Sequence, residues 1–511
     1  MISNSRRIAK NTLMLYFRMI LITGVSLYTI RVVLNVLGID DFGIYSVIVG
    51  IVSLCSFLSG SMASATQRFF AFALGKNDLN ALKTTFTVNW ILYAVIAIVA
   101  WIAMETVGLW FVNEHLQVPE ERFSAASTLY HLSIFTLIAG VFTSPFMAIM
   151  IAHEDMHIYA FASITEALMK LGAAILLIYL PGDKLELYGI LLLVASVFTS
   201  AIYIGFCVWK YEECQFKDFY WDKTLLWEIL SFTGWTLFGQ LSTVVRSHAV
   251  TVLLNQTFNP AVVAARTIAV NVAIQTNTFA SNFNVGLYPS IIKSYAADER
   301  DEMFSYVFNG SKMTFFLMWI FTLPLFLQME VILNLWLREP PPDAVWFTRL
   351  ALLEALVLSV SLPLATAARA PGKMRLYELT LGIMQITIFP ISWLVLKLGG
   401  AAYSVFVVAI AVNLLMFIVR LVIVRALVGI SVGDFFRKVG VPVSGAVLFS
   451  SLPSITVANL LPAGLVFSVL SIALSMMFSL VCIYSFGFDK KWRKKIRNEI
   501  LSRMHSWSLF S

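Results

Sequence analysis

Apolar residues fill the chain in long stretches, and short polar segments separate them. An apolar stretch of about 20 residues is long enough to cross a lipid bilayer as a helix, and the chain contains fourteen such stretches. They comprise residues 12–37, 42–66, 84–112, 125–151, 159–180, 188–209, 229–254, 266–290, 313–337, 346–368, 376–397, 401–424, 439–458 and 464–487. The pattern predicts an all-α polytopic membrane protein with about 14 transmembrane helices.

Within two of these stretches, polar residues recur at helical spacing. The later stretch carries Thr267, Asn271, Gln275, Thr278 and Asn282, and the earlier one carries Thr236, Gln240, Thr243, Ser247 and Thr251. Spacings of three and four residues place each set on one face of a helix. Hydrogen bonding between helices would explain a few such residues, but amides that face lipid would stay unsatisfied. The stripes therefore favour a hydrated cavity, and its predicted polar lining is Asn271, Gln275, Asn282, Gln240 and Thr243.

The composition excludes most soluble classes of protein. Of the 511 residues, 59% are hydrophobic and 13% are charged, where soluble domains have about 45–50% and about 25%. No soluble core could bury so much apolar surface, so a cytosolic enzyme, a secreted disulfide scaffold and a disordered chain are all excluded. The four cysteines form no CxxC pair, and we expect neither a zinc site nor any cofactor.

The distribution of Lys and Arg predicts the orientation of the chain in the membrane. One set of helix ends, which includes both termini, holds 26 of these residues, and the opposite ends hold only Arg122, Lys184, Arg338 and Lys397. Because basic residues concentrate in cytoplasmic loops, both termini are expected in the cytoplasm. The basic segment 490–503 is expected to lie on anionic lipid and not on nucleic acid.

A loop of about 20 residues after the sixth stretch divides the chain into two halves that begin on the same side. Any repeat is then parallel, related by a pseudo-two-fold axis along the membrane normal. The predicted organisation is an N-terminal six-helix lobe (1–211), a cytoplasmic linker (212–228), a C-terminal six-helix lobe (229–428), a final helix pair (429–488) and a basic cytoplasmic tail (489–511).

Charged groups at membrane depth are candidates for function, because each is costly unless it is paired, hydrated or near an end. Arg31 and Arg246 have no carboxylate within four residues on their own helix, so each needs water, a partner helix or an anion. Arg18 and Arg266 lie closer to helix ends, where they could also snorkel to the interface. We predict all four as cavity cations that bind substrate.

Acidic groups in the spans are fewer than basic ones. Glu166 and Lys170 have the i,i+4 order of a self-contained helical pair. Glu354 is the candidate for coupling to a proton or sodium ion, with His248 as an alternative for a proton.

Residues 153–157 match HExxH, the signature of zinc proteases. Zinc chemistry would require the motif on a helix with a third ligand nearby. The segment instead fills a short polar turn between two predicted helices, so we interpret it as a hinge. No phosphate-binding GxxxxGK[ST] motif is present, and the chain is not expected to be an enzyme.

The segments YTIRVVLNVLGIDDFGIYSVIVGIVSLCSFL (28–58) and SMASATQRFFAFALGKND (61–78) closely resemble the polysaccharide-biosynthesis (O-antigen type) branch of the multidrug/oligosaccharidyl-lipid/polysaccharide exporter superfamily. IAHEDMHIYAFASITEALMKLG (151–172) looks like the same branch's turn between helices 4 and 5. In such families an LG..[FY]G turn, here Leu37-Gly38 and Phe42-Gly43, joins helices 1 and 2. The resemblance covers about residues 1–180 by motif and the remainder by topology.

The resemblance implies two six-helix lobes around a central cavity that alternates its access. It also implies flipping of an undecaprenyl-pyrophosphate-linked oligosaccharide, the repeat unit of O-antigen or another surface polysaccharide, across the bacterial inner membrane. Cavity arginines would engage the pyrophosphate, and by position Arg31 is the best match and Arg18 the next. The assignment of Arg246 rests on the residue pattern, because an alignment of the two halves of the chain places it on neither Arg31 nor Arg18.

Other functions stay open at this point. A flippase for another polyprenyl-linked glycan, such as the peptidoglycan precursor, would need similar chemistry. A cation-coupled multidrug exporter of the same superfamily should carry acidic residues in its cavity, whereas basic residues outnumber them here. A non-transporting scaffold would need no polar stripes. The expected partners are a polyprenyl-pyrophosphate-linked glycan, a coupling ion and a glycan polymerase, and we expect a monomer.

Overall fold

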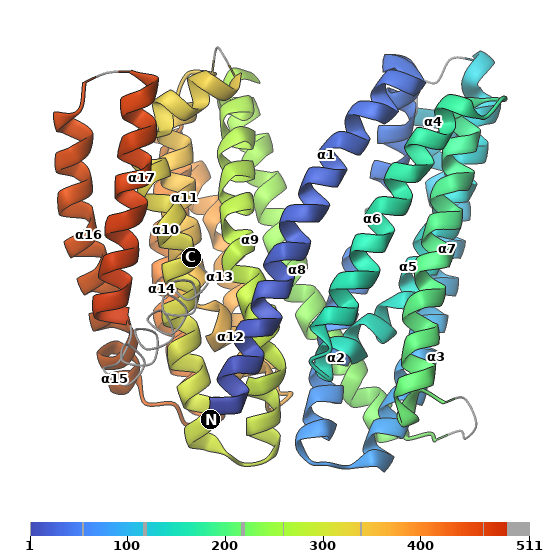
Figure 1. Ribbon diagram of the computed structural model, residues 1–511, viewed down its shortest axis with the longest axis horizontal. Helices are drawn as coiled ribbons and strands as arrows, with labels where there is room; N and C mark the ends of the chain where they lie inside the picture. Colours follow the sequence, from blue (N-terminus) through green and yellow to red (C-terminus); the bar gives the residue numbers. More distant parts are fainter. Residues whose placement is uncertain are drawn as a thin grey trace, which may run out of the picture. The chain divides into compact units, whose positions relative to one another are not determined.

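The computed structural model describes residues 2–53, 56–115, 120–215, 220–258, 260–337, 340–462 and 464–487, and every element in these ranges is helical. The chain forms two compact units (Figure 1). Unit 1 comprises residues 1–237 and 288–299, and unit 2 comprises residues 238–287 and 300–511. The predicted basic tail 489–511 lies outside the described residues, as does Arg338.

Unit 1 is built from seven α-helices joined by short 3-10 and π segments. They are α1 (Ile2–Ser53), α2 (Ser56–Gly75), α3 (Leu79–Ala103), η1 (Met104–Gly108), α4 (Leu109–His115), η2 (Glu120–Arg122), α5 (Phe123–Ala152), α6 (Met156–Tyr179), α7 (Lys184–Lys210) and η3 (Glu212–Cys214). Two long helices, α8 (Lys223–Thr257) and α9 (Pro260–Ala296), contribute residues to both units.

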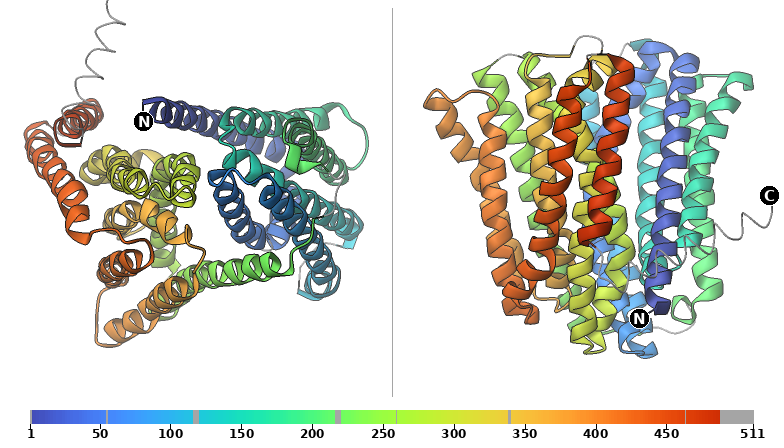
Figure 2. Two further views of the ribbon diagram at one scale, coloured as in Figure 1. Left: turned by 90° about the horizontal axis from the view of Figure 1, so that it is seen from below. Right: turned by 60° about the vertical axis from the view of Figure 1, so that its left-hand side comes forward.

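Unit 2 continues from α8 and α9 with eight further α-helices. They are α10 (Arg300–Leu337), α11 (Ala344–Val360), α12 (Leu362–Arg369), α13 (Arg375–Lys397), α14 (Ser404–Val428), α15 (Val432–Phe435), η4 (Phe436–Gly440), α16 (Val441–Leu460), α17 (Leu465–Cys482) and η5 (Ile483–Gly487). The last pair, α16 and α17, lies along α10 (Figure 2). The buried indole of Trp319 on α10 donates to Ser450 on α16 over 2.9 Å.

Twelve helical segments of the described chain are long and apolar enough to cross a membrane, and they coincide with twelve of the fourteen predicted spans. The other two are not confirmed. The predicted span 42–66 crosses residues 54–55, which are not described. The predicted span 266–290 lies in α9, a continuous helix of 37 residues and about 55 Å. Its length suffices, but its polar residues lower its hydropathy below that of the other spans.

The turn predicted near residues 37–43 is a break in α1 at Gly38, whose φ of 78° and ψ of 175° depart from helical values. A side chain would strain the backbone at this φ, so glycine suits the position. Just beyond it, the carboxylate of Asp41 accepts hydrogen bonds from Arg122 of η2. The same guanidinium donates to Asp183, which caps the N-terminus of α7. One arginine therefore ties three segments of unit 1 together at the same end of its helices.

Packing inside unit 1 centres on α5, which contacts α1, α2, α3 and α7, while α1 also packs along α6. Two hydrogen bonds join polar groups between helices of this unit. The hydroxyl of Tyr130 donates to the carbonyl of Met104 in the π segment η1 over 2.6 Å, and the same oxygen accepts from the backbone N–H of Leu109. Thr66 donates to the side-chain oxygen of Asn89 over 2.9 Å.

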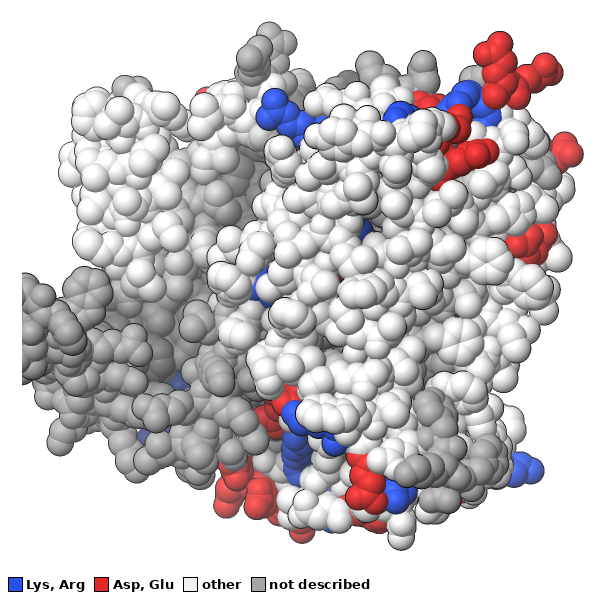
Figure 3. Space-filling model, turned by 45° about the vertical axis from the view of Figure 1, so that its right-hand side comes forward, with Lys and Arg blue, Asp and Glu red and all other residues white. Residues whose placement is uncertain are grey.

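Charged side chains follow the pattern expected of helices that contact lipid. On the face shown in Figure 3, Lys, Arg, Asp and Glu gather toward the top and bottom, and the surface between them is mostly uncharged. Large apolar side chains are exposed along the helices, as Val197 and Val422 illustrate. In water such a surface would be unfavourable, and in a bilayer it is the ordinary solvated surface.

Candidate functional site

The candidate site is a cavity of about 160 Å³ inside unit 2. Helices α8, α9, α11, α13 and α14 line it, mostly with small and aliphatic side chains. Its charged lining consists of Arg246, Arg266 and Glu354. The volume exceeds what a single water needs and suffices for several waters or a phosphate group.

Arg246 on α8 is paired across the cavity with Glu354 on α11. Its Nη1 donates to Oε1 of Glu354 over 2.9 Å, and Nδ2 of Asn413 on α14 donates to the same oxygen over 3.0 Å. Only about 15% of the Arg246 side chain and 13% of the Glu354 side chain are exposed. Of the three partners that the sequence left open for Arg246, the structure supplies a partner helix.

Glu354 is the residue that the sequence suggests for ion coupling. One of its carboxylate oxygens accepts two hydrogen bonds, from Arg246 and from Asn413. Its role in coupling remains a prediction.

Arg266 on α9 is the second cation of the cavity and is 8% exposed. Its Nη1 donates to Oγ1 of Thr251 over 2.6 Å, which is a neutral partner. Arg246 repels it electrostatically and Glu354 attracts it. The charged lining therefore comprises two guanidinium groups and one carboxylate, and no other Asp or Glu lines the cavity among the described residues.

The Nε atoms of Arg246 and Arg266 are buried and have no hydrogen-bond partner in the described part of the chain. Planar guanidinium groups bind phosphate and carboxylate groups through paired N–H donors. The cavity thus has a net positive charge and unused donors, which is the chemistry of an anion site.

The other two predicted cavity cations lie in unit 1 and do not line this cavity. The guanidinium of Arg18 stacks over the ring of Tyr159 on α6 at 4.6 Å from its centroid. Arg31 is exposed, further along α1. Thirteen residues separate the two arginines, so a regular helix turns them about 220° apart.

The five polar residues that the sequence predicts as a cavity lining do not line this cavity. Asn271, Gln275 and Thr243 are exposed, and Asn282 and Gln240 are partly buried, but none of the five lines the cavity in unit 2. The polar residues that do line it are Ser247 and Asn277.

Asn277 was missed by the sequence reasoning. It lies eleven residues after Arg266, which is three helical turns and the same face of α9. Its Oδ1 atom is buried without a hydrogen-bond partner in the residues that the structure describes. The spacing from Arg266 was the signal that could have found it.

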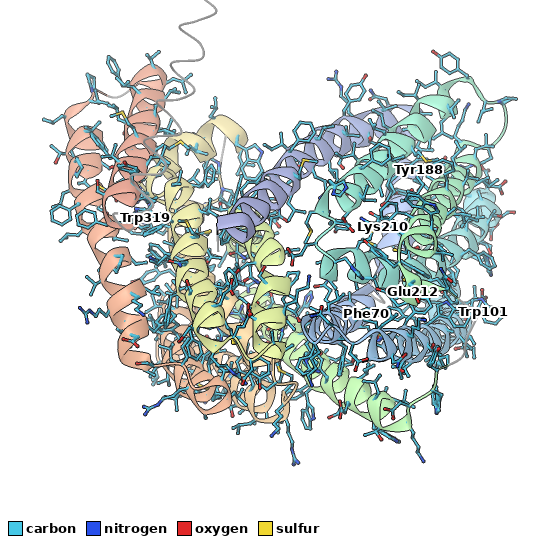
Figure 4. The ribbon with its side chains drawn as sticks, turned by 60° about the horizontal axis from the view of Figure 1, so that its bottom comes forward. Phe70, Trp101, Tyr188, Lys210, Glu212 and Trp319 are labelled. Atoms are coloured by element: carbon cyan, nitrogen blue, oxygen red, sulfur yellow. The ribbon has the colours of Figure 1, made fainter. Side chains whose placement is uncertain are left out.

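The HExxH segment is a turn whose charged residues have separate partners, and its role as a hinge remains a prediction. His153 contacts Glu213, Glu154 binds Lys293 over 2.9 Å, and Asp155 binds Lys210 over 2.7 Å. Lys210 and Glu212, labelled in Figure 4, come from the end of α7 and from η3. No cluster suited to a metal ion is found in the described chain.

These contacts also affect the ionisation of Asp155. Burial raises the pKa of this carboxyl group, but hydrogen bonds from Lys210 and Tyr211 outweigh that effect, so its pKa lies below the ordinary value. The predicted pair of Glu166 and Lys170 is confirmed at 2.6 Å.

No family model and no curated protein matches the chain. Its similarity to known proteins is found among solved structures. An outward-facing multidrug resistance MATE family transporter of the MOP superfamily is 14% identical, with a TM-score of 0.72 over 83% of this chain and 96% of that chain. A MATE protein in the bent conformation is also 14% identical, with a TM-score of 0.71 over the same shares. The chain has the fold of the MOP superfamily transporters.

A MOP superfamily transporter from Pyrococcus furiosus shares this fold with a TM-score of 0.63 and 15% identity, over 83% of this chain and 96% of that chain. That protein is described as having a binding pocket of reverse polarity, which suggests a different function for it. The first and the last of these neighbours are described as transporters.

Proposed function

We propose that this chain is a flippase that moves an undecaprenyl-pyrophosphate-linked oligosaccharide, the repeat unit of O-antigen or another surface polysaccharide, across the bacterial inner membrane by alternating access. The observation that carries the proposal is that two guanidinium groups, Arg246 and Arg266, line the cavity of unit 2, where the one carboxylate among the described lining residues is paired with Arg246. Each phosphate of a pyrophosphate would meet donors of opposite charge there.

The charge of the cavity distinguishes this proposal from multidrug export. A pump for cationic compounds needs acidic groups at its binding site, and here the single acid, Glu354, is already paired with Arg246. The Pyrococcus furiosus transporter supports the view that pocket polarity varies within the MOP fold.

The remaining parts of the proposal rest on the sequence. Arg31 and Arg18 would contact the pyrophosphate at another stage of transport, and the stripe residues Asn271 and Gln275 would contact sugars. The division at residues 211 and 228, cytoplasmic termini, a monomeric state and contact with a glycan polymerase belong to the same proposal.

A reconstituted flipping assay tests the function. Purified protein in liposomes is supplied with a fluorescent polyprenyl-pyrophosphate-linked oligosaccharide, and a membrane-impermeant lectin reports the fraction that has crossed. We expect wild-type protein to transfer the lipid, and Arg246→Ala and Arg266→Ala to lose most of that transfer. The matched control is Arg425→Ala, which removes an exposed arginine of α14 in the same unit.

The outcomes separate the candidate functions. Equal transfer by wild type, Arg246→Ala and Arg266→Ala would contradict the anion site. Transfer of polyprenyl-linked peptidoglycan precursor in preference to the oligosaccharide would favour the related flippase. Export of a cationic dye without lipid transfer would favour multidrug export.

A further inference from the structure

Glu378 is a buried carboxylate of unit 2 that neither the cavity nor the sequence reasoning includes. It lies in the first turn of α13 and is 8% exposed. No hydrogen bond or ion pair to its carboxylate occurs among the described residues, although Arg369 and Arg420 act on it electrostatically. A charge buried in a membrane-spanning helix without hydrogen-bond donors is costly, which makes this carboxylate a candidate for a functional role.

The carboxylate is held against α8 by a close approach of two helices. A Cβ atom at Gly239 on α8 would overlap Oε2 of Glu378, so a larger residue there would force the carboxylate to move. One turn further along α13, a Cβ atom at Gly382 would lie 2.8 Å from the ring of Phe238 and 3.0 Å from Oγ of Ser242. On each helix a glycine therefore lies against a side chain of the other helix. We call this close contact of Gly239 and Gly382 with the facing helix the glycine joint between α8 and α13.

The charged surroundings of Glu378 come from three helices. Arg369 ends α12, and Arg420 lies on α14 with its guanidinium over the ring of Tyr377, 5.9 Å from the centroid. Both arginines attract the ionised carboxylate of Glu378 electrostatically. Uptake of a proton by Glu378 would remove that attraction.

The joint is connected to the anion cavity through α8. Seven residues separate Gly239 from Arg246, which is two helical turns, about 10 Å, on nearly the same face. Ile388 of α13 also lines the cavity. Any shift of α8 against α13 at Glu378 would therefore move the guanidinium of Arg246 relative to Glu354.

From this geometry we infer that Glu378 binds the coupling proton and that the glycine joint between α8 and α13 transmits its protonation to Arg246. The inference rests on the proposed transport function. The step is a simple proton transfer. Water on one side of the membrane gives a proton to the carboxylate, which becomes a neutral carboxylic acid, and water on the other side later removes it. The neutral acid no longer attracts Arg369 and Arg420, which frees the joint to shift.

Infrared difference spectroscopy on the purified full-length protein tests the proton site without any substrate. Spectra recorded between two pH values report the carbonyl stretch of protonated carboxylic acids. We expect a titrating band that Glu378→Gln removes and Glu330→Gln retains, since Glu330 is an exposed glutamate of α10 in the same unit. A spectrum that Glu378→Gln leaves unchanged would overturn the inference.

A transport measurement tests the coupling itself, with the fluorescent lipid-linked oligosaccharide as probe. In liposomes with an imposed pH gradient, Glu378→Gln should lose gradient-driven transfer but keep exchange of lipid between the leaflets without a gradient. Gly239→Ala displaces the carboxylate and should have the same effect, whereas Gly234→Ala, whose added Cβ meets open space on α8, should transfer lipid as wild type does. Gradient-driven transfer by Glu378→Gln at the wild-type rate would overturn the inference.

Failure of the proposed function gives a different result. If the wild-type protein transfers no lipid-linked oligosaccharide, the transport function proposed above is wrong, while the infrared band still decides whether Glu378 takes up a proton.

Discussion

The ion pair of Arg246 and Glu354 has a structural role in addition to the role in anion binding proposed above. Both side chains lie mostly out of solvent, and each would be costly to leave without the other. Arg266 adds a cation whose hydrogen-bond partner, Thr251, is neutral. Loss of Arg246 consequently has two effects, one on folding and one on anion binding, and an experiment has to separate them.

A double-mutant cycle separates the two effects. Arg246→Met alone and Glu354→Leu alone should each lower the free energy of unfolding by about 3 kcal/mol, because each leaves the other group without its countercharge. Arg246→Met combined with Glu354→Leu should regain most of that stability, because both charges are removed together. The cycle is measured by thermal unfolding in detergent.

Binding should respond differently from stability in the same cycle. The double variant should remain unable to bind a polyprenyl pyrophosphate, although it is folded. Strictly additive losses of stability, or normal binding by the double variant, would show that the two residues do not act as this pair.

At the scale of helices, α9 combines an apolar face with exposed amides. Ala265, Ala269 and Ala280 are buried, while Asn271 and Gln275 are exposed. Amides in contact with lipid would have no partners for their donors. The arrangement is therefore understandable only if water reaches this side of α9.

Cysteine labelling measures that hydration directly. The four native cysteines are first replaced by serine, and single cysteines are then introduced as Asn271→Cys and Gln275→Cys. We expect both to react with a membrane-impermeant, water-soluble maleimide, because water solvates the stripe. Val422→Cys, on an exposed apolar part of α14, is the control and should remain unlabelled. Stripe cysteines that react no faster than the control would contradict a hydrated face.

At the scale of the whole molecule, local pattern predicted the helices and tertiary packing determined the site. Apolar stretches predicted twelve helices that the structure confirms as candidate spans, because hydropathy is a property of contiguous residues. The polar stripe of α9 lowers the same signal, which leaves that span unconfirmed. The broken helix at Gly38 was also readable, from the glycine in its turn motif.

The partners within the site could not be predicted in the same way. Arg246 and Glu354 are 108 residues apart, and only the packing of α8 on α11 brings them together. Asn413 and Glu378 were overlooked because a single polar residue in an apolar stretch has no periodicity to mark it. Contacts of this kind depend on which helices are neighbours, and an individual sequence contains no direct record of that.

The measurement that tests the central claim most directly is the affinity of the purified protein for polyprenyl pyrophosphate compared with uncharged polyprenol of the same length. Two charge-assisted interactions predict binding of the pyrophosphate about 100-fold tighter, or about 2.7 kcal/mol. The preference should disappear in a variant that combines Arg246→Ala with Arg266→Ala, and it should persist in Arg425→Ala. Equal affinity for the two lipids, or tighter binding of a cationic amphiphile, would contradict an anion site in this cavity.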